Sequence, residues 1–440
     1  MLNLKEKLKT ITKRQSGKLR DGSSPTRQFA SNLSFRSIDN LLIKLVSFIL
    51  VLWFTRVLTS DELGLYSFAL SVTTVFVIFG SLGIRGALTK VVPEKLARNK
   101  KKEAANWVLG GLKLTTLSAL FTSLLLFIFS DQVALYVFAK PFASDAIKLA
   151  AGMIFFNVVS PFFTNLFVAL KKNNLCVYLR IVSELSRLFF IVLLVSLGLS
   201  YIGALYGYMI GLFIFLALAC LVLVRKYPLL FQGSPTGSRE IFSYSKWFLA
   251  FGFTYMLLFS VDSLMISALM PIRFTGYYNI VLAVINAFLL LIPVTKVSLP
   301  FLSEVSHSRS LLEKRFKKML YITLALTLSL AFFIVLLSKQ MLTFFYPPEY
   351  VENGWLPLAF LAFMIPAKSL LWLHIQKLIV LGKMEYQLYL MLLAGALNFV
   401  LNYLLISSFG IVGAAIASVT SLLVVTLLTM YLIKRITKRN

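Results

Sequence analysis

The chain has 440 residues, of which 59% are hydrophobic, and its 44 Lys and Arg against 17 Asp and Glu give a formal net charge of +27. A soluble nucleic-acid-binding protein would spread such charge over a polar surface, whereas here it falls mostly into short gaps between long apolar runs. This pattern excludes an ordinary soluble domain and predicts a polytopic membrane protein.

Twelve apolar runs follow one another along the chain, each long enough for a helix that crosses a bilayer core of about 30 Å. In the first half they lie at 38–58, 65–84, 107–129, 148–170, 181–199 and 204–224. In the second half they lie at 247–270, 277–299, 319–338, 355–380, 386–406 and 411–433. The expected fold is therefore all-α, with twelve transmembrane helices.

These runs divide the chain into five expected segments. They are a basic cytoplasmic tail at 1–37, expected to be disordered, six helices at 38–228, a cytoplasmic linker at 229–246, six helices at 247–433, and a basic tail at 434–440. The first 37 residues contain no apolar run of the kind found in a cleavable signal peptide.

Basic residues predict the orientation, because Lys and Arg are retained on the cytoplasmic side of a membrane. In alternate gaps between spans, 33 of the 44 lie on one side, and only Lys140, Lys148, Arg273 and Lys339 lie on the other. Both termini are therefore expected in the cytoplasm.

No catalytic or cofactor-binding pattern accompanies the spans. His307 and His374 have no second His or carboxylate at metal-ligand spacing, and no Gly-rich phosphate loop ends in Lys-Ser or Lys-Thr. The gaps on the outer side are too short for a folded domain. We therefore expect no enzyme activity, no metal and no cofactor, and we interpret the chemistry as binding and movement.

An internal repeat relates the two halves. The segment SDELGLYSFA from Ser60 resembles PIRFTGYYNI from Pro271, matching Gly64 to Gly276 and Tyr66 to Tyr278. In addition, SLGLSYIGALYG from Ser196 resembles ISSFGIVGAAIA from Ile406. Six spans per repeat is an even number, so the halves should share their orientation and be related by a pseudo-twofold axis along the membrane normal.

Three segments resemble one family of membrane transporters. The run TRVLTSDELGLYSFALSVTTVFVIFGSLGIRGALTK from Thr55 resembles the opening signature of Wzx-type polysaccharide exporters. The run YYNIVLAVINAFLLLIPVTKVSLPFLSE from Tyr277 is similar to their eighth span, and LNFVLNYLLISSFGIVGAAIAS from Leu397 to their eleventh-to-twelfth hairpin. The resemblance implies a lipid-linked oligosaccharide flippase of the multidrug/oligosaccharidyl-lipid/polysaccharide (MOP) exporter superfamily. It also implies two six-helix bundles and a place in the inner, cytoplasmic membrane.

Seven basic residues lie inside the predicted spans, where each costs about 2.5 to 3.5 kcal/mol at the bilayer centre. They must reach the interface, pair, or face a wet cavity. Lys296 is the first cavity candidate, because it follows Asn279 and Asn286, which share one helical face. Lys368 is the second, whereas Lys377 lies on the other side of its helix and is expected to reach the cytoplasmic interface.

Two other basic residues, one inside the first predicted span and one just after the second, have two interpretations each. Lys44 either faces a cavity or reaches the headgroups, and Arg85 either contacts substrate or is one more charge retained in the cytoplasm. If these side chains and Asn286 line one cavity with Lys296 and Lys368, that cavity would suit the pyrophosphate of a polyprenyl or dolichyl lipid.

Three charged residues inside spans are candidates for ion coupling. Glu184 and Arg187 are three residues apart and share a helical face, so they form either a structural ion pair or a coupling site. Asp262 has no basic neighbour at helical spacing, so its partner must be a group on another helix or a cation. The coupling ion would be H⁺ or Na⁺.

The resulting functional prediction is alternating-access flipping of polyprenyl-pyrophosphate-linked oligosaccharide from the cytoplasmic to the outer leaflet. Expected partners are this lipid, membrane lipid, and glycan polymerase or glycosyltransferases, with no nucleic acid. The alternatives are a cation-coupled multidrug exporter of the same superfamily, a scaffold for envelope assembly without transport, and a membrane glycosyltransferase.

Overall fold

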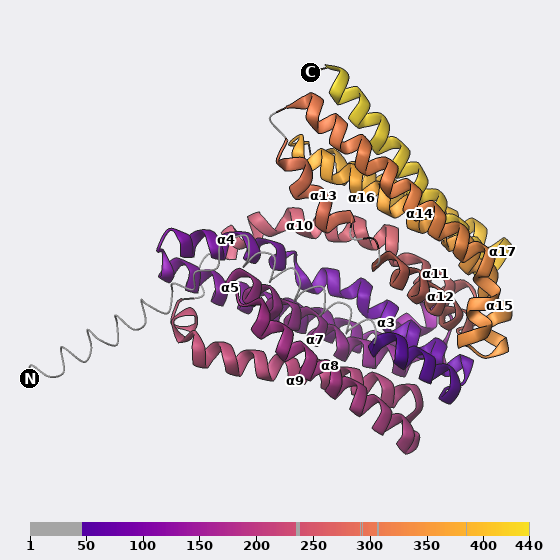
Figure 1. The fold of residues 1–440 in the computed structure, drawn as a ribbon. Helices are drawn as coiled ribbons and strands as arrows, with labels where there is room; N and C mark the ends of the chain where they lie inside the picture. The colour runs from indigo at the N-terminus through magenta and orange to yellow at the C-terminus, as the bar shows by residue number, and fades with distance from the viewer. Residues whose placement is uncertain are drawn as a thin grey trace, which may run out of the picture.

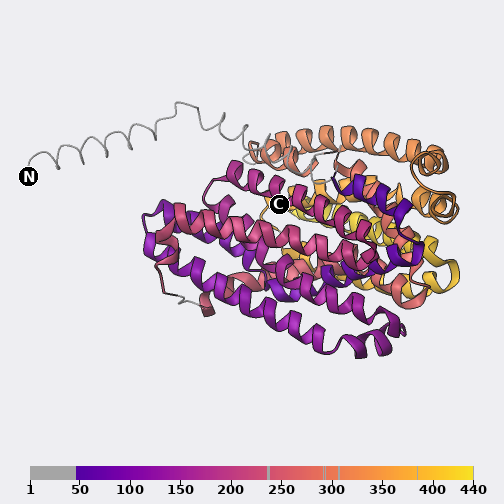
Figure 2. The same ribbon diagram turned by 90° about the horizontal axis from the view of Figure 1, so that it is seen from below.

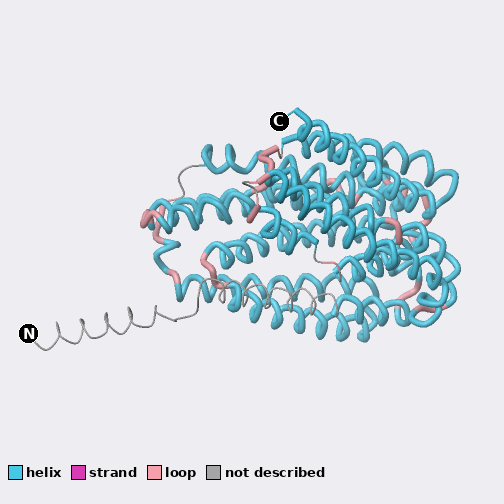
Figure 3. The backbone as a smooth tube through the Cα atoms, turned by 45° about the horizontal axis from the view of Figure 1, so that its top comes forward, coloured by secondary structure: helices cyan, strands magenta, loops and turns pink. Residues whose placement is uncertain are grey.

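The computed structural model describes residues 46–234, 238–290, 292, 294–305, 308–383 and 385–439, without the side chains of 238–240, 294–297, 300 and 437–439. The tail at 1–37 and Lys44 lie outside these residues, as does the side chain of Lys296. Throughout the described residues the regular structure is helical and no strand occurs, which confirms the prediction of an all-α protein (Figure 3).

The first group of helices runs from residue 46 to residue 231 and occupies the lower part of Figure 1. It consists of the helix Val46–Val57, α3 (Ser60–Ser81), α4 (Ile84–Ala97), α5 (Lys101–Ile128), α6 (Ser130–Gln132), α7 (Ser144–Ala169), α8 (Asn173–Leu194) and α9 (Ser200–Lys226), with short 3₁₀ and π turns between them. Helix α7 packs on α3, α5 and α9, so it lies at the centre of the group.

The second group occupies the upper part of Figure 1, and Figure 2 shows both groups from below. It consists of α10 (Ser238–Phe259), α11 (Val261–Leu269), α12 (Arg273–Leu290), α13 (Val294–Ser303), α14 (Arg309–Phe345), α15 (Pro348–Leu361), α16 (Met364–Val380) and α17 (Glu385–Arg439). Helix α17 packs on α10, α11, α15 and α16.

By length and apolar composition, eight helices of the described chain are able to cross a membrane, or up to nine when the bent pair α10–α11 is counted. Two of these stretches, Asn173–Lys226 and Glu385–Ile436, are 54 and 52 residues long, and each covers two predicted spans. The total of twelve transmembrane helices, the segment boundaries and the side of the termini stay predictions.

The two long stretches change direction at matching positions of the repeat. Ser200, where α9 begins, has φ 50° and ψ −141°, and Gly410 inside α17 has φ 60° and ψ −141°. The same unusual backbone conformation therefore recurs 210 residues further along the chain. Gly203 and Gly413 follow the two turns, and a Cβ on Gly413 would lie 2.0 Å from the Leu405 carbonyl oxygen. Small residues at these points let the two arms of each hairpin approach closely.

The two groups meet where α3 crosses α12. These two helices contain the other matched pair of segments, the one from Ser60 and the one from Pro271. A Cβ on Gly64 would lie 2.4 Å from the Ile272 carbonyl oxygen, and a Cβ on Gly276 would lie 3.2 Å from the Gly64 nitrogen. The two repeat-matched glycines therefore touch each other, and the absence of side chains allows the close crossing.

We expect Gly64→Ala to lower the free energy of unfolding by roughly 1 to 3 kcal/mol, because the added methyl group overlaps backbone that cannot move alone. Thermal unfolding in detergent measures the effect. Gly252→Ala in α10 is the matched control, since its Cβ would lie 3.7 Å from Ile78 Cγ2, an ordinary contact. Equal midpoints for the two variants would contradict the proposed close crossing.

Candidate functional site

A break in the membrane-spanning path of the second group positions the candidate site. Helices α10 and α11 are bent by 48° relative to each other at Ser260. Neither Pro nor Gly lies between residues 253 and 270, so the sequence carries no local signal for this break. Discontinuous helices at the interface between repeats are typical places for substrate and ion sites in transporters.

Asp262 follows this break and is 3% exposed. Its carboxylate accepts hydrogen bonds from Tyr278 Oη at 3.1 Å, from Asn402 Nδ2 at 2.7 Å, and from the Ser418 hydroxyl. Asn402 Nδ2 also donates to Asn398 Oδ1 at 3.0 Å. These five residues, which we call the Asp262 cluster, come from α11, α12 and both arms of α17.

The Asp262 cluster is neutral apart from the carboxyl group itself. Among the ion pairs of the described residues, none involves Asp262. The side-chain oxygen of Asn402 has no hydrogen-bond partner in the described part of the chain, although it is buried. An unpaired carboxylate is costly in a low-dielectric interior, so a cluster of this kind can take up a proton or a monovalent cation.

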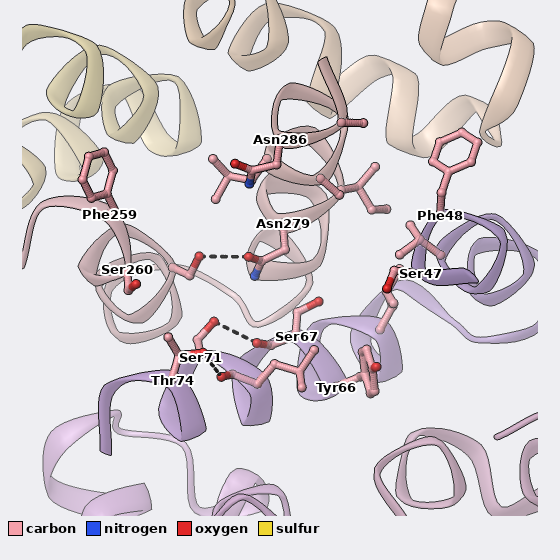
Figure 4. Close-up of a pocket in the computed structure, with 18 residues that line it drawn as sticks. Ser47, Phe48, Tyr66, Ser67, Ser71, Thr74, Phe259, Ser260, Asn279 and Asn286 are labelled. Carbon is pink, nitrogen blue, oxygen red and sulfur yellow. Dashed lines mark hydrogen bonds between the residues drawn. The ribbon is translucent and has the colours of Figure 1, made fainter. Parts of the chain in front are cut away.

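A cavity of about 370 Å³ lies between the two groups, next to the Asp262 cluster. Its wall comes from the helix Val46–Val57 and α3 on one side and from α10, α11 and α12 on the other. All its polar lining side chains are uncharged hydroxyls or amides, namely Ser47, Tyr66, Ser67, Ser71, Thr74, Ser260, Ser263, Asn279 and Asn286 (Figure 4). Among the described residues, no charged side chain lines this cavity.

Two neighbouring hydrogen bonds connect α11 to α12, one in the Asp262 cluster and one at the cavity wall. Tyr278 of α12 donates to Asp262 of α11 inside the cluster. One residue further along each helix, Ser263 Oγ donates to Asn279 Oδ1 at 3.1 Å, and both of these residues line the cavity (Figure 4). The same pair of helices therefore joins the Asp262 cluster to the cavity wall.

An ion pair lies behind the cavity wall in the first group. Glu184 Oε2 and Arg187 Nη2 of α8 are 2.6 Å apart, and Arg187 Nη2 donates to Ser47 Oγ at 3.2 Å. The guanidinium carbon lies 5.4 Å from the centroid of the Tyr208 ring, whose hydroxyl donates to Asn157 Oδ1 at 3.2 Å. Because Ser47 lines the cavity, the ion pair is one side chain away from it.

The predicted site residues occupy different places. Asn286 lines the cavity. Lys368 is half-buried, and its Nζ lies 4.3 Å from the ring centroid of Phe259, which lines the cavity, so the ammonium group stands behind the wall. Arg85 is half-buried at the start of α4 and is not part of the lining. Lys44 and the Lys296 side chain lie outside the described residues.

Lys377 is buried and paired, and its place relative to the cytoplasmic interface stays a prediction. It is 3% exposed, and its Nζ lies 2.6 Å from Glu313 Oε1 of α14 and 4.3 Å from the centroid of the Phe316 ring. A partner on a neighbouring helix therefore satisfies the charge where sequence spacing alone shows none.

The partners of Asp262 could not be predicted from the sequence. All four partners lie on other helices, so no spacing along α11 joins them to Asp262. Tyr278 lies 16 residues away on the next helix, whereas Asn402 and Ser418 lie 140 and 156 residues away. One signal was present, because Asn398 and Asn402 lie four residues apart on one face of an otherwise apolar span. Polar side chains on one face of such a helix usually turn toward protein.

Comparisons with known proteins agree on a family and a fold. A family model described as "Polysaccharide biosynthesis protein" matches residues 29–306. An uncharacterised membrane protein of Methanocaldococcus jannaschii is 22% identical, with 84% of this chain and 78% of that protein covered.

Solved structures of MOP superfamily transporters share the fold. An inward-facing multidrug resistance MATE transporter matches with a TM-score of 0.77 at 14% identity, covering 91% of this chain and 98% of that one. The lipid II flippase MurJ in an inward closed conformation matches with a TM-score of 0.65 at 13% identity, covering 90% and 87%. Identities this low show the fold alone.

We expect the Glu184 and Arg187 side chains to be energetically coupled, because the pair is largely removed from water. A double-mutant cycle with Glu184→Gln and Arg187→Gln should give a coupling energy of roughly 0.5 to 3 kcal/mol in the free energy of unfolding. The control is the pair Glu94 and Arg98, whose side chains are 48% and 67% exposed. It should give at most about 0.5 kcal/mol, and equal couplings would contradict the expectation.

Proposed function

Because the chain belongs to the family of polysaccharide biosynthesis proteins, we propose that it flips a polyprenyl or dolichyl pyrophosphate-linked oligosaccharide to the outer leaflet of the cell membrane. The family match covers residues 29–306, which include the first group of helices and the α3–α12 crossing. The headgroup would pass between the two groups, and the prenyl chain would remain in lipid.

The observation that carries this proposal is that the wall of the central cavity bears hydroxyl and amide groups and, among the described residues, no charged group. An exporter of cationic drugs, the competing function within the superfamily, would be favoured by a carboxylate where the drug binds. In the described residues the lining has no carboxylate, and hydroxyl and amide groups contribute half of its 18 side chains. Such a wall favours a ligand rich in hydroxyl groups over a cation.

The pyrophosphate of the substrate requires basic groups outside this lining. We keep Lys296, Lys368, Lys44 and Arg85 as the proposed contacts. Lys368 supports this proposal by its position, because its ammonium group lies against Phe259 of the cavity wall. Arginine and lysine are the side chains that neutralise phosphate oxygens.

The Asp262 cluster is the proposed site of the coupling ion, H⁺ or Na⁺. It combines one carboxylate with amide and hydroxyl oxygens, and the buried Asn402 oxygen has no partner among the described residues. A bound cation would supply the charge that the neighbouring helices do not. The cavity and the ion site share α11 and α12, so binding at one site would alter the other.

The function is tested by reconstituting purified protein in vesicles with a fluorescent polyprenyl-pyrophosphate oligosaccharide. We expect the label to become accessible on the opposite leaflet with wild-type protein. Lys368→Ala and Lys296→Ala should each lower the initial rate by roughly tenfold or more, because a charge-assisted contact to phosphate contributes about 1.5 to 3 kcal/mol. If stable wild-type protein moves no such lipid, the flippase proposal fails, and wild-type rates in both variants would remove the two lysines from the site.

The ion site is tested by thermal unfolding in detergent with Na⁺ or a large organic cation, over a range of pH. A bound cation stabilises the folded protein by about 2.7 kcal/mol at one hundred times its Kd. We expect Na⁺ or a change of pH to shift the midpoint of the wild type, and Asp262→Asn to abolish that shift. Glu352→Gln, at an exposed carboxylate of α15, should retain it. Identical responses of wild type and Asp262→Asn would exclude Asp262 as the site.

A further inference from the structure

The central cavity offers hydrogen-bonding groups that no other residue of the described chain uses. In the described part of the chain, the Asn286 amide and the hydroxyls of Ser67 and Ser260 have no hydrogen-bond partner, although all three line the cavity. Ser71 and Thr74 donate their protons to backbone oxygens of their own helix, at 2.8 and 2.9 Å, which leaves hydroxyl lone pairs as acceptors. The wall can therefore both donate and accept.

Besides Tyr66, two phenylalanine rings line the cavity. Phe48 comes from the helix Val46–Val57 and Phe259 from the end of α10, and Figure 4 shows them on opposite sides, with Asn279 and Asn286 between them. A sugar ring has apolar C–H faces and a rim of hydroxyl groups. Aromatic side chains suit the faces, and amide and hydroxyl side chains suit the rim.

The charge of the wall restricts the ligand further. A carboxylate, phosphate or ammonium group placed here would lose its hydration without meeting an opposite charge, because the lining of the described structure contains none. Arg187 does not supply the charge, since Glu184 already pairs with it behind Ser47. An uncharged, hydroxyl-rich group is the ligand that avoids this cost.

We infer that this cavity is a subsite for an uncharged sugar residue, which the Phe48 and Phe259 rings contact and which Asn286, Ser67 and Ser260 bind through its hydroxyls. The inference rests on the proposed function, and it divides the substrate between two places. The neutral sugar occupies the cavity, and the pyrophosphate binds to basic groups outside it. At about 370 Å³ the cavity is at the lower end of the range for ligand pockets, about 300 to 1,000 Å³, so it holds part of an oligosaccharide.

The test compares two synthetic lipids that share the prenyl chain, the pyrophosphate and the first sugar. The second sugar is a neutral hexose in one lipid and the corresponding hexuronate in the other. In reconstituted vesicles we expect wild-type protein to flip the neutral lipid at least about tenfold faster, because the hexuronate carboxylate would enter the cavity unpaired. Asn286→Ala should slow the neutral lipid by about 3- to 10-fold, as expected for one lost hydrogen bond.

A variant that adds a positive charge to the cavity wall gives a sharper test. Asn286→Lys places an ammonium group on the cavity wall, and it should reverse the preference in favour of the hexuronate lipid. Asn353→Lys is the control, because Asn353 lies in α15, outside the cavity lining, and should keep the wild-type preference. If Asn286→Lys does not fold, Ser67→Lys on the facing helix α3 tests the same reversal.

The outcomes separate the two proposals. If wild-type protein flips both lipids at equal rates and neither lysine variant changes the ratio, the sugar subsite is wrong and the flippase function stands. If the hexuronate lipid is preferred by the wild type, the charge argument is overturned. If neither lipid moves, the flippase function fails, and the subsite fails with it.

Discussion

A carboxyl group buried among membrane-spanning helices has to be satisfied by the protein itself, and in this molecule that requirement falls on Asp262. Water is absent from the hydrocarbon region, so every donor must come from a neighbouring helix. Tyr278 of α12 and Asn402 and Ser418 of α17 supply them. The three contacts fix α11 against α12 and against both arms of the α17 hairpin, and the break at Ser260 then turns the next residues toward the cavity.

The sequence contains most of the fold and less of the site, for a physical reason. Apolar length and the period of the helix are local properties, so each of the twelve predicted runs overlaps a helix wherever the structure describes it. The repeat also held structural meaning, since the matched glycines Gly64 and Gly276 lie against each other. In contrast, the partners of Asp262 and the Glu313 partner of Lys377 depend on which helices become neighbours. Which helices become neighbours is decided by packing, and the spacing of residues along one helix does not predict it.

The cavity also changes how the charge of the chain is interpreted. A net charge of +27 suggests a basic binding surface. Nevertheless, the side chains that line the central cavity are neutral in the described structure, and Lys368 and Arg187 stand one residue behind the lining. Most basic residues occur in the gaps between the predicted spans, where they are expected to set orientation. Net charge therefore says more about how this protein sits in a membrane than about what its cavity holds.

The adjacent hydrogen bonds that Tyr278 donates to Asp262 and Ser263 donates to Asn279 have a thermodynamic consequence. Each bond joins α11 to α12; one lies at the proposed ion site, and its neighbour lies at the cavity. If an occupant of the cavity changes the affinity of Asp262 for a cation, the cation must change the affinity of the cavity by the same factor. Under that reciprocity the affinity of the cavity for its cargo would follow the concentration of the cation on the side to which the proposed ion site is open.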